Sequence, residues 1–102
     1  MKKIYIAGKY RSSTEWGLEE NIRRAETAAI KLWQQGYAVL CPHKNTAHFG
    51  GACPDEAWLK GDIEFLKVCD CIYMLKGWEG SLGACEELRI AQEHNLEVIY
   101  ES

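Results

Sequence analysis

Residues 3–41 read KIYIAGKYRSSTEWGLEENIRRAETAAIKLWQQGYAVLC, and their hydrophobic pattern changes period twice. Residues 3–7 form a short apolar run rich in β-forming side chains. Residues 17–35 instead carry apolar side chains at helical spacing, and Gly36 follows as a helix stop. A second β-forming run occupies residues 37–41. This stretch therefore predicts a strand, a helix and a second strand.

The same alternation continues to the end of the sequence. The further predicted elements are a loop from Pro42 to Cys53, a helix from Pro54 to Lys67, a strand at 69–75, a helix from Ser81 or Gly83 to His94, and a strand at 97–100. Such alternation predicts a parallel sheet with helices on both faces. We predict one α/β domain over residues 1–102, a flavodoxin-like three-layer sandwich whose four parallel strands have the order 2-1-3-4. Within residues 69–75, strand alternation places Cys69 and Cys71 on one face.

Composition excludes several classes of function. The net charge is −3 and no basic run occurs, which argues against binding to nucleic acid polymers or to anionic membranes. No apolar stretch approaches the ~20 residues that span a bilayer, and the N-terminus lacks the pattern of a signal peptide. The five cysteines are an odd number, which indicates reduced thiols. We therefore expect a cytoplasmic protein.

Ligands of open parallel sheets bind beyond the carboxyl ends of the strands, which selects three loops. The first loop runs from Gly8 to Gly17, between a strand and a helix, where backbone N–H groups attract anions. Arg11 and the neighbouring hydroxyl groups suit a phosphate or a carboxylate, and Tyr10 lies beside Arg11. We predict that Gly8, Tyr10 and Arg11 bind substrate; the alternative is a solvated polar turn.

The second loop, after the second strand, is long and polar. We predict that His43 and Asn45 line the substrate site, since long loops at this edge of a sheet often carry function. A zinc site is the competing interpretation, and its candidate ligands would be Cys41, His43, His48 and Cys53. These four residues lack the closely spaced ligand pairs of structural zinc sites. We therefore predict no metal, and a solvated loop is the third alternative.

The third loop leads into a helix that carries two consecutive glutamates. With about 100° per residue, Glu86 falls on the solvated side of this helix, and Glu87 falls at the edge of the packed face. A half-solvated carboxylate near the start of a helix suits a cleft. Glu87 and Asp62, on the preceding helix, would supply the paired carboxylates of glycosyl chemistry. The alternative for Glu87 is a boundary glutamate held by an arginine or lysine.

Three separated motifs resemble one family. Ser81-Leu-Gly83-Ala-Cys-Glu-Glu87-Leu followed by Ala91 is similar to the S-L-G-x-x-x-E-L-x-x-A signature of 2′-deoxynucleoside 5′-phosphate N-hydrolases, which belong to the nucleoside 2-deoxyribosyltransferase-like superfamily. Residues 62–70 resemble the D-x-x-x-L-x-x-x-D motif of that superfamily, and residues 5–11 resemble its phosphate loop. The sequence also resembles small uncharacterised bacterial and phage members.

The resemblance implies cleavage of the N-glycosidic bond of a nucleoside or its 5′-monophosphate, by hydrolysis or base transfer and without a cofactor. It implies that Glu87 is the nucleophile, that Asp62 assists departure of the base or positions the sugar, and that Ser81 and Gly83 bind substrate. Cys85 departs from the hydrolase signature, which has glycine at that position. A non-catalytic nucleotide-binding module of the same fold is the alternative.

The sequence also suggests self-association. Four tryptophans in 102 residues exceed what a small core readily buries, so we expect some of them at an interface or over a ligand. The resemblance implies the same, because this superfamily commonly completes its sites across dimers. We therefore expect a homodimer or a higher homo-oligomer that binds a small molecule.

Overall fold

Strands and helices alternate along the chain in the computed structural model, which describes residues 1–102. In order, the elements are β1 (Lys3–Ala7), α1 (Glu15–Gln34), β2 (Ala38–Leu40), α2 (Pro42–Asn45), α3 (Asp55–Leu66), β3 (Cys71–Met74), the 3-10 turn η1 (Trp78–Gly80), α4 (Leu82–Glu93) and β4 (Glu97–Tyr100). The predicted alternation is therefore confirmed, with one additional short helix and one additional turn.

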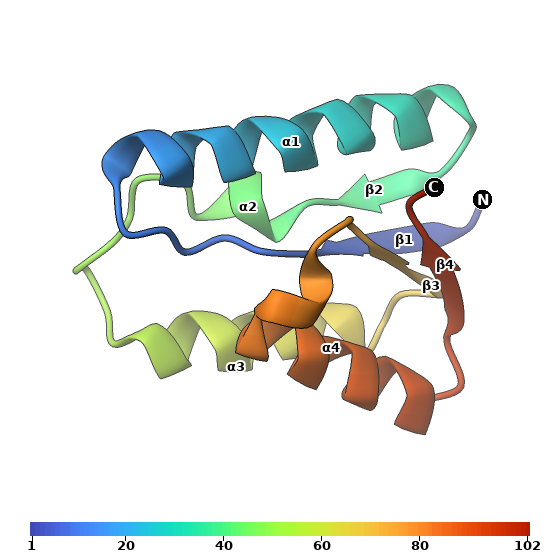
Figure 1. The fold of residues 1–102 in the computed structure, drawn as a ribbon. Helices are drawn as coiled ribbons and strands as arrows, with labels where there is room; N and C mark the ends of the chain where they lie inside the picture. The colour runs from blue at the N-terminus through green and yellow to red at the C-terminus, as the bar shows by residue number, and fades with distance from the viewer.

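The four strands form a single parallel sheet in the order β2-β1-β3-β4. Helix α1 covers one face of this sheet, and α3 and α4 cover the other (Figure 1). The flavodoxin-like three-layer arrangement and the strand order 2-1-3-4 are confirmed. Because every strand runs in the same direction, all of the carboxyl ends lie at one edge of the sheet.

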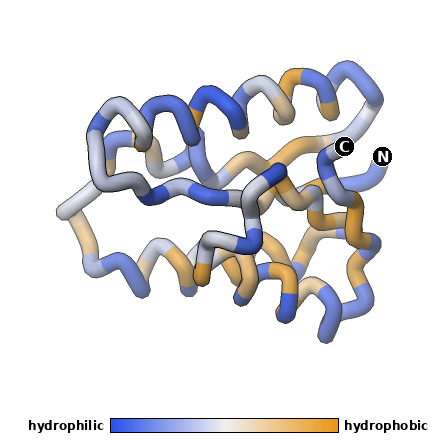
Figure 2. The backbone as a smooth tube through the Cα atoms, viewed as in Figure 1, coloured by the Kyte–Doolittle hydropathy of each residue, from blue (hydrophilic) through white to orange (hydrophobic).

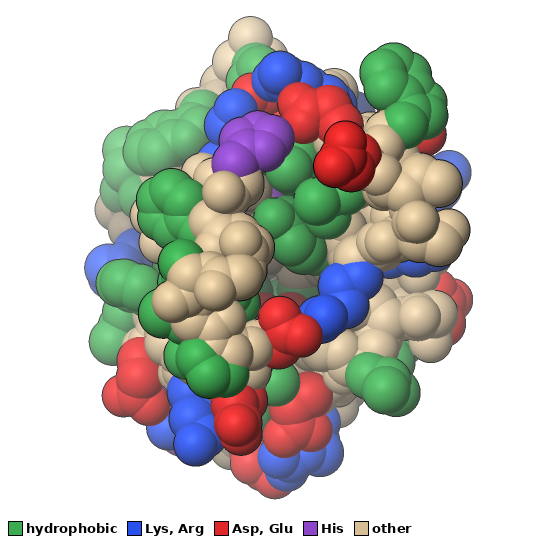
Figure 3. All heavy atoms as spheres, turned by 90° about the vertical axis from the view of Figure 1, so that its left-hand side faces the viewer, with side chains coloured by type: hydrophobic (Ala, Val, Ile, Leu, Met, Phe, Trp, Pro, Cys, Tyr) green, Lys and Arg blue, Asp and Glu red, His purple; other side chains and the backbone are tan.

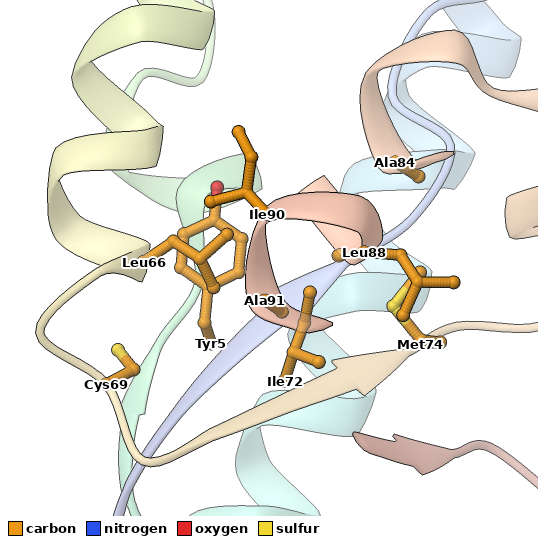
Figure 4. Packing of buried hydrophobic residues seen from close by; sticks show 10 residues of the cluster. Tyr5, Leu66, Cys69, Ile72, Met74, Ala84, Leu88, Ile90 and Ala91 are labelled. Atoms are coloured by element: carbon orange, nitrogen blue, oxygen red, sulfur yellow. The ribbon is translucent and has the colours of Figure 1, made fainter. Parts of the chain in front are cut away.

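The core has two halves because successive side chains of a strand point to opposite faces. Ile4 and Ile6 of β1 pack with the buried side of α1. Tyr5 and Ala7 pack on the other face with α3 and α4, where Leu66 lies beside the Tyr5 ring (Figure 4). Hydrophobic residues accordingly concentrate in the strands, and hydrophilic residues predominate on the outer helix turns (Figure 2).

Helix α1 begins two residues earlier than predicted. The Thr14 side chain caps it by accepting a hydrogen bond from the Gly17 backbone N–H at 2.9 Å. Its predicted end is confirmed, since Gly36 has a φ of 97°, a conformation that favours glycine. No helix in the structure is both long and apolar enough to cross a membrane.

The segment after β2 contains a helical turn where the sequence predicted only a loop. Strand β2 is shorter than the predicted residues 37–41, because Cys41 already serves as the N-cap of α2. Its carbonyl accepts hydrogen bonds from the backbone N–H groups of Lys44 and Asn45. Pro42 occupies the first turn, a position that does not require an N–H donor.

The two neighbouring cysteines lie on opposite faces of the sheet, so the prediction of a shared face was wrong. Cys69 packs with the α3 and α4 side, and Cys71 packs with the α1 side. Strand β3 begins only at Cys71, after a turn in which the Asp70 carboxylate accepts a hydrogen bond from the Lys3 backbone N–H. Strand alternation therefore does not apply to Cys69.

Gly8 lies where β1 passes close to the segment after β3. A Cβ atom at this position would lie 2.7 Å from both Cβ and Cδ1 of Leu75. We expect Gly8→Ala to lower the free energy of unfolding by about 1–3 kcal/mol, because Leu75 is itself buried and has little room to move. Urea denaturation measures the change.

Gly61 provides the matched control for this substitution. It lies in α3, and a Cβ atom built on it meets no other atom within 4 Å. Gly61→Ala should raise the free energy of unfolding by about 0.5–1 kcal/mol, since alanine favours helix. Equal effects of the two substitutions would show that the close approach at Gly8 carries no constraint.

Candidate active site

The loops after β1, β2 and β3 meet at the carboxyl edge of the sheet, as the parallel topology requires. Figure 3 looks onto this edge and shows a hollow near its middle, lined in part by hydrophobic side chains and flanked by acidic and basic ones. The predicted site residues come from these loops and from the helices that follow them.

Glu87 is the most deeply buried carboxylate of the protein. Its side chain comes from α4 and is 8% exposed, so the prediction of a half-solvated group was wrong. No lysine or arginine forms an ion pair with it; instead the Tyr5 hydroxyl donates a hydrogen bond to Oε2. The interpretation of Glu87 as a boundary glutamate held by a cation therefore fails.

The environment of Glu87 disfavours its charge. Burial is the largest influence and raises the pKa of Glu87, the Tyr5 hydrogen bond lowers it, and the charge of Asp62 raises it, so that the pKa comes to about 7. By contrast, Glu86 is only half-buried on the outer side of α4, as the helical wheel predicted, and its pairing with Arg89 lowers its pKa. Glu87 is therefore a carboxylate that titrates near neutral pH.

Asp62 lies on α3, half-buried and facing the same region. Burial raises the pKa of this carboxyl to about 6, and its charge acts on both Glu87 and Tyr5. The structure thus brings the two predicted carboxylates within electrostatic reach of each other. Two acids with pKa values near neutral suit proton transfer and nucleophilic attack.

Tyr5 belongs to this group, although the sequence analysis identified it only as part of a strand. Its ring is fully buried, and its oxygen lies between α3 and α4 (Figure 4). Burial and the charges of Glu87 and Asp62 raise the pKa of its hydroxyl, which therefore remains protonated and donates. The available signal was a polar-tipped aromatic inside an apolar run, since a buried tyrosine hydroxyl requires a partner.

Replacing Tyr5 with phenylalanine should shift the titration of Glu87 toward higher pH. The Tyr5 hydrogen bond lowers the pKa of Glu87, so its loss leaves burial and the Asp62 charge unopposed. If activity requires ionised Glu87, the acid limb of the profile of kcat/KM against pH moves to higher pH. Tyr73→Phe is the control, because Tyr73 packs on the α1 side of the sheet. An unshifted limb in Tyr5→Phe would contradict this role.

The loop after β1 is held in place at several points. The Asn21 side chain donates hydrogen bonds to the carbonyl oxygens of Tyr10 and Arg11, at 3.0 and 3.3 Å. The Arg11 guanidinium forms an ion pair of 2.8 Å with Asp55, the first residue of α3. Neither Asn21 nor Asp55 was predicted from the sequence, because each contacts this loop from a separate helix, and hydrophobic periodicity does not report such contacts.

His43 lies against this same loop. Its Nε2 is 3.2 Å from the Lys9 carbonyl oxygen, and the Tyr10 ring meets its edge at 5.8 Å between centroids. Burial lowers the pKa of His43, so the imidazole is neutral, and its buried Nδ1 has no hydrogen-bond partner in the protein. His43 and Tyr10 thus lie together at the first loop, and their role in binding substrate stays a prediction.

Ser81 and Gly83 lie at the start of α4. Ser81 is the N-cap, and its hydroxyl oxygen accepts a hydrogen bond from the Ala84 backbone N–H at 3.1 Å. Its O–H remains a donor. Gly83 has open space beside it, since an added Cβ would meet only the Ser81 Oγ, at 3.9 Å. The two residues therefore leave room for a ligand within reach of one hydroxyl donor.

Asn45 is the predicted site residue that the structure places elsewhere. It is exposed and lines a shallow groove with Trp33 and Lys44, on the α1 side of the sheet. Asp62 and Glu87 lie on the other side. The structure contains no group of three or more histidine, cysteine, aspartate or glutamate side chains placed to hold a metal ion.

Solved structures share this architecture. A 2-desoxiribosyltransferase from Leishmania mexicana superimposes with a TM-score of 0.68 and 19% identity, over 98% of this chain and 63% of that one. A 2-deoxyribosyltransferase from Bacillus psychrosaccharolyticus superimposes with a TM-score of 0.66 and 20% identity, over 96% of this chain and 70% of that one. The fold is therefore nucleoside 2-deoxyribosyltransferase-like, and the chain spans a little under two thirds of the length of the Leishmania protein.

The chain belongs to the family described as a domain of unknown function, DUF4406, whose sequence model matches residues 2–100. No curated protein sequence matches this chain.

Proposed function

We propose that this protein cleaves the N-glycosidic bond of a nucleoside or its 5′-monophosphate through a covalent intermediate on Glu87. The observation that carries the proposal is a buried carboxylate with no cationic partner, hydrogen-bonded by Tyr5 and influenced by the charge of Asp62. Burial of such a carboxylate destabilises the fold, so a structural role does not account for it. The fold that it shares with deoxyribosyltransferases supports the same chemistry.

The proposed reaction has two steps. A Glu87 oxygen forms a bond to the anomeric carbon while the bond from that carbon to the base nitrogen breaks. Asp62 in its protonated form supplies the proton that the departing base takes up, and its raised pKa keeps part of it protonated near neutral pH. Water or the nitrogen of a second base then attacks the anomeric carbon, the bond from that carbon to Glu87 breaks, and the Asp62 carboxylate takes up the proton that the attacking group loses.

Release of free base tests the proposal directly. The protein is incubated with the four common 2′-deoxynucleosides, the matching ribonucleosides, and the 5′-monophosphates of both, with and without an acceptor base. Chromatography then separates the products. A free base with water alone indicates hydrolysis, and a new nucleoside indicates transfer. No product from any substrate, with the protein folded, would refute the proposal; binding without turnover would favour the non-catalytic nucleotide-binding module.

We also propose that the protein acts as a homodimer or higher homo-oligomer. Trp16, at the start of α1, is 73% exposed, and Trp33, near its end, is also largely exposed. Large exposed aromatic side chains are enriched at protein interfaces. Light scattering measures the assembly state, and a monomer at micromolar concentration would contradict this part of the proposal.

A further inference from the structure

The ion pair between Arg11 and Asp55 connects two elements that supply predicted site residues. Arg11 lies in the loop after β1, and Asp55 is the first residue of α3, which also carries Asp62. Arg11 Nη1 lies 2.8 Å from Asp55 Oδ2, and no other ion pair connects this loop to α3. The two residues are 44 positions apart in sequence, so they meet only in the folded protein.

The Asp55 carboxylate is the anionic group that pairs with Arg11 in the structure. Arg11 is the guanidinium that we predict the first loop offers to a phosphate or carboxylate, and it already forms an ion pair with the Asp55 carboxylate. Both side chains are about 70% exposed, so the pair itself contributes little stability. A stronger anion can therefore displace Asp55 from Arg11, but the negative charge of Asp55 remains close to the incoming group.

Two basic side chains of the segment after β2 also lie close to carboxylates. Lys44 of α2 pairs with Glu26, and His48 lies 3.8 Å from Glu19. Lys9 is the one other cation of the first loop, and it is exposed without an ion pair. Arg11 itself is already paired with a carboxylate, which suits an uncharged ligand group beside it better than a dianion.

We infer that Asp55 is a selectivity residue, which disfavours a 5′-phosphate at Arg11 and directs the site toward uncharged nucleosides. The inference rests on the proposed function, since it names the substrate class of the same site. A 5′-phosphate carries nearly two negative charges near pH 7 and is repelled by Asp55, whereas a 5′-hydroxyl is not. Asp55 need not contact the reacting atoms for this effect.

Kinetic comparison of paired substrates tests the inference. Each 2′-deoxynucleoside is assayed against its own 5′-monophosphate, and the readout is the ratio of the two kcat/KM values. The wild-type protein should favour the nucleoside. Asp55→Asn should move the ratio about tenfold toward the monophosphate, the size expected for repulsion between exposed charges a few ångströms apart. A wild-type preference for the monophosphate, or an unchanged ratio in Asp55→Asn, would overturn the inference.

Glu56→Gln is the matched control. Glu56 is the next residue of α3, is exposed and forms no ion pair, so this variant removes the same charge from the same helix turn. It should leave the ratio within about twofold of wild type, because exposed charges that are not adjacent are screened by salt. An equal shift in Glu56→Gln would assign the effect to net charge and overturn the role of Asp55.

A binding measurement separates failure of the inference from failure of the proposed function. Inorganic phosphate is titrated into wild type, Asp55→Asn and Asp55→Asn with Arg11→Gln, and calorimetry gives the affinities. Asp55→Asn should bind phosphate about tenfold more tightly than wild type, and the added Arg11→Gln should remove the gain. If no variant releases base but this pattern holds, the proposed catalysis fails and the selectivity stands. If phosphate affinity is equal in all three proteins, the inference fails whatever the catalytic result.

Discussion

Replacing Glu87 with glutamine should abolish base release, lowering kcat/KM by about a thousandfold or more. Glutamine has nearly the same shape and retains an oxygen that accepts from the Tyr5 hydroxyl, so the fold is preserved. It cannot form the proposed ester with the anomeric carbon. The assay is release of base from the best substrate of the wild-type protein. Full activity in Glu87→Gln would assign the nucleophile to another group.

The control for this loss is the neighbouring residue. Glu86 lies one position earlier on α4, but it is more exposed and pairs with Arg89. Glu86→Gln should leave base release within about twofold of wild type, because it removes only a surface ion pair. A comparable loss in both variants would indicate that the charge of α4, rather than the buried carboxylate, supports activity.

The same Glu87→Gln variant should change how stability depends on pH. The pKa of Glu87 is about 7 in the folded protein, against 4.5 for an ordinary glutamate. Between these values the folded state holds a proton that the unfolded state has lost, so the free energy of unfolding falls as pH rises through this window. The free energy of unfolding has fallen by about 3 kcal/mol once the pH exceeds the folded-state pKa. The Glu87→Gln variant does not show this loss, because glutamine does not titrate.

Denaturation at pH 4.5 and pH 8 measures this difference. The advantage of Glu87→Gln over wild type should be small at pH 4.5 and about 3 kcal/mol larger at pH 8. Asp62, whose pKa is also raised by burial, remains in both proteins, so its own titration largely cancels. An advantage that does not grow with pH would show that ionised Glu87 is stabilised in the folded state.

Leu66→Ala should lower the free energy of unfolding by about 3 kcal/mol, within the 2–5 kcal/mol typical of buried leucines. Leu66 is the one fully buried side chain of α3, and it packs beside the Tyr5 ring (Figure 4). The substitution removes both apolar contact area and the support of the helix that carries Asp62. Against a total stability of about 5–15 kcal/mol for a domain of this size, the loss is large.

Phe65→Ala controls for the loss of a large side chain from the same turn. Phe65 is 49% exposed, whereas Leu66 is fully buried. Phe65→Ala should cost less than about 1 kcal/mol, because much of its ring already contacts water. Urea denaturation at pH 7 compares the two variants, and a larger loss for Phe65→Ala would mean that α3 is anchored through its outer face.

Some residues of the candidate site could be placed from the sequence, and others could not. Periodicity placed Glu86 on the outer side of its helix and Glu87 only at the edge of the packed face, because a helical wheel depends only on neighbouring residues; the structure buries Glu87. Asn45 was assigned to the site because its loop follows a strand, but the turn of α2 directs that residue to the α1 side. Loop positions follow local hydrogen bonds that hydrophobic patterning does not report.

The sequence by itself determined the alternation of strands and helices and the edge of the sheet at which functional groups gather. These follow from apolar periodicity and from the handedness of the crossovers. Only the tertiary structure decided that Glu87 is buried, that Tyr5 is its partner, and that Asp55 meets Arg11. Each of these contacts joins residues from separate elements, so it exists only once the helices have packed on the sheet. Glu87 and Tyr5 are 82 positions apart, and no local pattern specifies that meeting.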